Sequence, residues 1–114
     1  MATLKFESLV LESGEFAERL GWESLALSKA LAANRVFYLD SNNTRYYPAF
    51  YTDKRYERRQ LEAVTKLLGA LPGEAKWTFF TQPKASLSKL TPLQALERGK
   101  LTEVKAAAKG YVER

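Results

Sequence analysis

The 114-residue chain contains no cysteine and no histidine. Without cysteine it has no disulfide, no thiol nucleophile and no zinc site built on thiolates. Without histidine it lacks the side chain that most often acts as a general base near neutral pH. An enzyme would have to use carboxylates, lysine, tyrosine or serine, and no nucleophile stands in a recognisable pattern with a base. We therefore expect a protein that is not an enzyme and that carries neither a cofactor nor a metal.

Long hydrophobic runs are also missing. Apolar residues make up 46% of the chain, but no run approaches the roughly 20 residues that a bilayer-spanning helix needs. The N-terminus does not resemble a signal peptide, because Glu7 and Ser8 interrupt its apolar residues and Glu12 and Glu15 follow. These features predict a cytoplasmic protein with no membrane partner, folded as one compact unit or as two small lobes that share a core.

Positive charge is in excess and unevenly placed. The formal net charge is +5, which favours anionic partners. The first 33 residues nevertheless hold more acids than bases, whereas the segment "KRYERR" is strongly basic through Lys54, Arg55, Arg58 and Arg59. A nucleic-acid contact is expected in this middle region, with a solvated helix start or a protein interface as the alternatives.

Two short helical patterns near the N-terminus are separated by a glycine. In the first, Ser13 is the expected N-cap and Gly21 the expected end. In the second, Ser24 is the expected N-cap, the apolar residues Leu27, Ala30 and Leu31 share one face, and Ser28 and Lys29 lie opposite. Together they predict a helix-turn-helix.

A β-hairpin is predicted to follow. Apolar and polar residues alternate from Arg35, and Asn42 and Asn43 tolerate positive φ, which places the hairpin tip there. Pro48 cannot donate to a sheet, so the second strand is expected to be short or at an edge. The aromatic residues of this region are expected to pack in the core rather than to stack on bases.

Helices are predicted for most of the remaining chain. Asp53 is the expected cap of a helix that carries the basic cluster in its first half and stops at Gly69. The segment "AKWTFFTQP" is either a short helix or extended chain, and a loop follows it. Thr91, Pro92 and Gln94 predict a capping box, and the final helix is expected to end near Gly110. The predicted fold class is mainly α with one short β-hairpin, divided into lobes at residues 1–52 and 53–114.

A helix-turn-helix followed by a hairpin is typical of a winged DNA-binding protein. Ser24, Ser28 and Lys29 would then face base edges, Arg35 and Arg45 would meet phosphates, and Asn43 would lie at the wing tip. The basic cluster of Lys54, Arg55, Arg58 and Arg59 would form a further phosphate-binding edge. The alternative is that two short helices and a hairpin form an ordinary core, because the outward helix face is poor in Arg, Asn and Gln.

The C-terminal segment "KWTFFTQPKASLSKLTPLQALERGKLTEVKAAAKGYVER" resembles the toxin-binding domain of Xre/MbcA/ParS antitoxins. The matching features are Trp77, Pro83, Leu87, Leu90, the Thr91-Pro92-Leu93 start, Leu96, Gly99, Val104 and a small-residue final helix that ends at Gly110. This resemblance covers the last third to half of the chain. That family usually has an all-helical DNA-binding half, whereas the N-terminal half here resembles a MerR-like or winged helix-turn-helix.

The resemblance implies a homodimeric antitoxin of a type II toxin-antitoxin system. Such a protein binds and occludes a RES-type toxin that depletes NAD, and it regulates its own transcription by binding duplex DNA. The implied toxin contacts are Lys105, Lys109, Gly110, Tyr111, Val112, Glu113 and Arg114. The alternative function is a DNA-binding transcriptional regulator of a phage or mobile element that has no toxin partner.

Overall fold

A computed structural model describes residues 9–113, and a small antiparallel sheet lies in its N-terminal half. The strands β1 (Val10–Glu12), β2 (Leu39–Ser41) and β3 (Thr44–Pro48) are ordered β1-β3-β2. The sequence predicts a short strand or an edge strand here. Because β1 pairs with β3, the latter is the central strand and the edge alternative is wrong, while the strand ends at Pro48 after 5 residues. Pro48 is accommodated as the last residue of β3, opposite Val10.

The hairpin turn between β2 and β3 has the predicted residues at its tip. Asn42 and Asn43 have φ values of 52° and 65° and link Ser41 to Thr44, which are paired across the strands. Two consecutive residues at positive φ form the type I′ turn whose twist matches that of the flanking strands. The predicted hairpin is therefore confirmed.

The predicted helix-turn-helix is formed by α2 (Ser13–Leu20) and α3 (Ser24–Ala32). Gly21 ends α2 in the left-handed conformation, with φ of 71°, and its amide donates to Glu18 O. Neither predicted serine cap is correct, because Ser13 and Ser24 are the first helical residues. Glutamates occupy the cap positions and make no side-chain cap hydrogen bond.

The helix α4 (Arg58–Leu68) follows the short 3₁₀ helix η1 (Ala49–Thr52). The predicted cap at Asp53 is wrong, because its carboxylate instead accepts hydrogen bonds from the backbone and guanidinium of Arg55. Residues 54–57 precede the helix, which begins at Arg58. The basic cluster is consequently divided between a turn and the first turn of α4, and Gly69 ends the helix as expected.

Three helices form the C-terminal part: α5 (Gly73–Thr81), α6 (Pro92–Glu97) and α7 (Leu101–Val112). The segment left open by the sequence is thus helical, and the loop after it contains the 3₁₀ helix η2 (Ala85–Leu87). The capping box is confirmed, since Gln94 N donates to Thr91 Oγ1 at 3.0 Å and Thr91 N donates to Gln94 Oε1 at 2.9 Å. The helix α7 continues past its expected end at Gly110.

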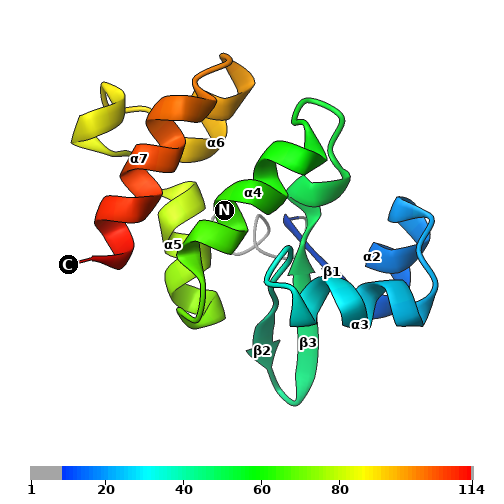
Figure 1. Cartoon of the computed structure of the whole chain (residues 1–114). Helices are drawn as coiled ribbons and strands as arrows, with labels where there is room; N and C mark the ends of the chain where they lie inside the picture. The colour runs from blue at the N-terminus through cyan, green and yellow to red at the C-terminus, as the bar shows by residue number, and fades with distance from the viewer. Residues whose placement is uncertain (1–8, 114) are drawn as a thin grey trace, which may run out of the picture.

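One hydrophobic cluster joins the two halves of the described chain. In Figure 1, α4 lies between the sheet with its helix-turn-helix and the group α5, α6 and α7. The ring of Phe37 stacks on Phe80 with centroids 6.1 Å apart, and Phe50 stacks on Trp77 at the same distance. The aromatic residues therefore pack in the core, as expected. The fold class is confirmed as mainly α with a short hairpin.

Candidate nucleic-acid interface

The outward face of α3 is exposed along its whole length. Leu25, Ser28, Lys29 and Ala32 lie on it at i, i+3, i+4 and i+7, next to the exposed Ser24. The opposite face buries Leu27 and Ala30 in the core. The structure therefore places Ser24, Ser28 and Lys29 on one accessible surface, as the sequence predicts, and adds Leu25 to it.

A shallow groove lies beside this face, at the turn between α2 and α3. Its volume is about 310 Å³, and it is lined by Gly21, Trp22, Glu23, Leu25, Ala26 and Lys29. Trp22 is half-buried, and the guanidinium carbon of Arg58 lies 5.3 Å from its ring centroid. The Trp22 ring thus forms one wall of the groove, and Arg58 of α4 packs against it.

The hairpin presents its tip to solvent. Asn42 and Asn43 are both exposed. Arg45 lies opposite Asp40 in the ladder, and its guanidinium carbon is 4.2 Å from the centroid of the Tyr38 ring. This cation–π contact holds the Arg45 side chain against the sheet. Asn43 at the hairpin tip and Arg45 on the side of the hairpin are therefore exposed at two different places.

Arg35 and Arg58 converge on one carboxylate that the sequence reading did not single out. Arg35 Nη1 is 3.8 Å from Glu62 Oε1, and Arg58 Nε is 3.3 Å from Glu62 Oε2. Glu62 is largely buried, and within residues 9–113 neither Arg58 Nε nor Glu62 Oε2 has a hydrogen-bond partner. The two arginines are therefore partly neutralised and tie α4 to the turn and to the chain after α3.

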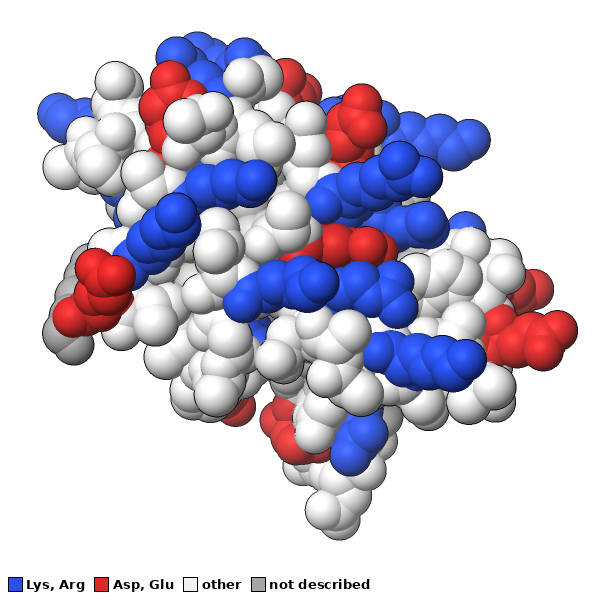
Figure 2. All heavy atoms as spheres, in the orientation of Figure 1, with Lys and Arg blue, Asp and Glu red and all other residues white. Residues whose placement is uncertain are grey.

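A band of basic side chains crosses the face shown in Figure 2. Blue Lys and Arg side chains run over α7, α4 and α3, with acidic side chains between some of them. Basic residues of these three helices include the exposed Lys29 of α3, Arg59 and Lys66 of α4, and Lys109 of α7, together with the half-buried Lys105. In this view, basic side chains over α7, α4 and α3 follow one another across the same face of the molecule.

The turn before α4 is less available for phosphates than its composition suggests. Arg55 Nη2 is 2.8 Å from Asp53 Oδ2. Hydrogen bonds from the Arg55 side chain, and then from its amide, lower the pKa of the Asp53 carboxyl. Lys54, Arg55 and Arg59 are all exposed, but Arg55 is paired with Asp53 within its own turn.

The predicted toxin-binding residues do not form a free tail. Residues 109–112 belong to the last turn of α7, and Tyr111 faces inward. Its ring centroid is 5.2 Å from that of Phe79, and its hydroxyl donates to Ala75 O at 3.1 Å. Lys109, Gly110, Val112 and Glu113 are exposed, Lys105 is half-buried, and Arg114 lies outside the described residues.

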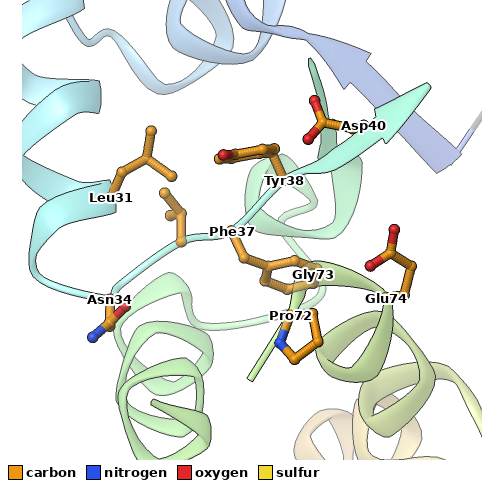
Figure 3. A pocket seen from close by; sticks show the side chains of 9 residues that line it. Leu31, Asn34, Phe37, Tyr38, Asp40, Pro72, Gly73 and Glu74 are labelled. Carbon is orange, nitrogen blue, oxygen red and sulfur yellow. The ribbon is translucent and has the colours of Figure 1, made fainter. Parts of the chain in front are cut away.

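A second cavity, shown in Figure 3, is lined by acidic residues rather than by basic ones. It has a volume of about 340 Å³ between the end of α3, the chain leading into β2, and the start of α5. The carboxylates of Asp40 and Glu74 line it, and among residues 9–113 no lysine or arginine does. An anionic ligand such as a nucleic-acid phosphate is disfavoured here.

No three His, Cys, Asp or Glu side chains between residues 9 and 113 are grouped so that they could hold a metal ion. No helix within the same range has the length and hydrophobicity to cross a membrane.

Comparison with known proteins gives no relative. No protein-family model, no curated protein and no solved structure matches the chain.

Sequence reasoning missed two residues of this interface. Leu25 was overlooked because only the polar members of the outward face were considered, yet its spacing to Ser28 and Lys29 already places it there. Glu62 could have been noticed as the i+4 partner of Arg58. Its contact with Arg35 joins separate elements, so no local pattern could have indicated it.

Proposed function

We propose that this protein is the antitoxin of a type II toxin-antitoxin pair, which binds and occludes a RES-type toxin that depletes NAD. One observation supports this most: the residues that resemble the toxin-binding domain of Xre/MbcA/ParS antitoxins occupy consecutive, packed elements. Contacts join α5 to α6, α6 to α7, and α7 to η2. A resemblance in residue order carries weight only where the residues share one structural unit.

Inhibition by this unit would be steric. Lys105 and Lys109 lie at i and i+4 on α7, and Glu113, the residue that caps its C-terminus, follows at i+8. Val112 is 41% exposed beside them. A helix that presents an apolar residue within a charged stripe is suited to bind along a groove of a partner protein. We propose this side of α7 as the toxin contact, with the protein acting as a homodimer.

The test begins with a chain tagged at its N-terminus and purified from its native host at moderate salt. We expect mass spectrometry to identify a stoichiometric RES-type partner. Expressed alone, that partner should lower cellular NAD and stop growth, and co-expression of the chain should restore both. Recovery of the chain without any protein partner would contradict the antitoxin function.

A matched pair of variants tests the contact surface. Changing Lys105→Glu and Lys109→Glu together should abolish the rescue of growth and NAD. The control, Lys89→Glu with Arg98→Glu, makes the same change in charge at two exposed positions outside α7 and should rescue fully. Circular dichroism confirms that both variants fold, and equal rescue by the two would exclude this face of α7.

DNA binding is a second candidate function, favoured by the helix-turn-helix and its type I′ wing beside the basic band. The antitoxin would use it to regulate its own transcription. The same activity without a toxin would make the protein a transcriptional regulator of a phage or mobile element. Purification distinguishes these two, because the regulator would be recovered with DNA and without a toxin.

The DNA-binding function predicts an affinity that weakens steeply with salt. A fluorescent duplex enriched from a random pool serves as the probe, and its anisotropy is measured over a range of salt concentrations. Lys29→Gln should reduce the slope of log K against log salt by about one, as expected for one phosphate contact. Lys89→Gln, in the loop before α6, should leave the slope unchanged. Absent or salt-insensitive binding would argue against this function.

A further inference from the structure

Leu25 carries a large apolar side chain that is mostly exposed and lies outside the hydrophobic core. It is 64% exposed, more than Leu9 or Val112, the other large hydrophobic residues that are exposed between residues 9 and 113. It is the second residue of α3, the helix that enters the major groove in helix-turn-helix proteins. We infer that Leu25 recognises the methyl group of a thymine in duplex DNA, an inference that rests on the DNA-binding function proposed above.

The neighbours of Leu25 discriminate poorly between bases. Ser24 and Ser28 carry hydroxyls that both donate and accept hydrogen bonds, so they can meet the edge of any base. The face contains no arginine, asparagine or glutamine, the side chains that form two hydrogen bonds to guanine or adenine. The feature of a base pair that an apolar side chain can select is the C5 methyl of thymine. Leu25 is therefore the residue on this face that is suited to select a base pair.

The shape of this surface allows the required approach. Ser24, Ser28 and Ala32 are short, so the backbone of α3 can come close to the floor of a major groove, which is wide enough to admit a helix. Leu25 projects from this low surface and also lines the groove at the turn. A methyl group on a base edge can thus meet both the leucine and the apolar wall that Trp22 provides.

Charge favours DNA over a second copy of the chain as the occupant of this surface. Lys29 lies on the same face and Glu23 lines the adjacent groove, and in Figure 2 basic side chains continue from α3 onto α4. Two copies that each carry a net charge of +5 would repel when such surfaces meet. A duplex would place its phosphates against these cations while the helix contacts the bases.

The experiment compares thymine with uracil, which differ by this methyl group. A duplex enriched from a pool with a randomised centre of about 12 base pairs is resynthesised with deoxyuridine in place of thymidine, one position at a time. Wild-type protein should bind one substituted duplex about fourfold more weakly, the value expected for one buried carbon. Leu25→Ala should bind both duplexes equally, whereas Leu9→Ala, which alters an exposed apolar residue outside the helix-turn-helix and outside α7, should retain the difference.

Each outcome separates this inference from the function on which it rests. If no duplex is enriched, the DNA-binding function itself fails. If enriched duplexes bind but no uracil substitution weakens them, or if Leu25→Ala keeps the difference, DNA binding stands and the role of Leu25 is overturned. A dimer in sedimentation that dissociates in Leu25→Ala, with unchanged recognition of thymine, would assign Leu25 to a contact between copies.

Discussion

Tyr51 and Thr65 form a hydrogen-bonded pair in the core, and its direction can be deduced. Thr65 Oγ1 donates its single proton to Leu61 O at 2.8 Å. The 2.5 Å contact with Tyr51 must therefore be donated by the tyrosine hydroxyl. Burial of the Tyr51 side chain raises the pKa of its hydroxyl, so the tyrosine remains a donor at neutral pH.

This direction predicts unequal effects of two conservative substitutions. Tyr51→Phe removes the donor and should lower the free energy of unfolding by about 1 kcal/mol. Thr65→Val leaves the tyrosine hydroxyl buried without its acceptor and should cost about 1–3 kcal/mol. Urea denaturation of the two variants measures the difference. A larger loss in Tyr51→Phe would mean that the proton is donated the other way.

Lys76 is an unusual member of the core because its side chain is only 5% exposed. It has neither an ion pair nor a side-chain hydrogen bond with any residue of the described range. Burial lowers the pKa of its amine from the ordinary value of 10.5. Folding therefore disfavours the charged form of this residue.

This lysine should make stability rise with pH. At a pH below the pKa of the folded state, the amine is charged in both the folded and the unfolded protein, and burying this charge destabilises the fold in full. At a pH above 10.5 the amine is neutral in both states, and the desolvation penalty disappears. Lys76→Met should therefore raise the melting temperature at neutral pH, by a margin that shrinks as pH approaches 10.5. A margin independent of pH would show that desolvation of the charge is not its cause.

At the scale of elements, Gly73 permits the start of α5 to touch the chain that leads into β2. A Cβ added at this position would lie 2.0 Å from Tyr38 O and 3.1 Å from Tyr38 C. Both are backbone atoms, so they cannot move aside as a flexible side chain would. Glycine is needed here for close approach, and this contact fixes how α5 meets the N-terminal half.

We expect Gly73→Ala to reduce the free energy of unfolding by about 2 kcal/mol or more, because the clash requires a shift of the backbone. Gly110 is the control, since it lies inside α7 and a Cβ there meets nothing within 4 Å. Gly110→Ala should raise stability by about 0.5–1 kcal/mol through its better helix propensity. Equal stability of the two variants would disprove the close approach at Gly73.

At the scale of the whole molecule, the end of α7 holds the C-terminal helices together. Tyr111 contacts Phe79 and Ala75 on α5. Ala75 lies 36 residues earlier in the sequence. Lys84 Nζ also lies 4.8 Å from the Tyr111 ring centroid. The last turn of α7 is thus part of the fold as well as part of the proposed toxin contact.

Two truncated chains test the contribution of Tyr111 to the stability of the fold. A chain that stops after Gly110 loses Tyr111 and should unfold with a free energy lower by about 2 kcal/mol, since a half-buried aromatic residue is removed. A chain that stops after Val112 keeps Tyr111 and should stay within about 0.5 kcal/mol of the full chain. Chemical denaturation measures both, and unchanged stability of the shorter chain would show that Tyr111 is dispensable for folding.

Features that depend on a few adjacent residues could be predicted from the sequence. The asparagine pair at the hairpin tip, Gly21 and Gly69 at helix ends, and the capping box at Thr91 all depend on backbone preferences or on hydrogen bonds within a few residues. The outward positions of Ser28 and Lys29 follow from helical periodicity in the same way. The predicted fold class followed from these local features.

The tertiary structure decided what depends on contacts between distant residues. Three-residue β1 has no distinctive pattern, and its pairing partner β3 lies more than 30 residues away. Glu62 between two arginines, Gly73 against Tyr38, and Tyr111 against α5 exist because the folded chain brings separate elements together. Local sequence therefore determined the elements, and packing determined which of their side chains remain available for a partner.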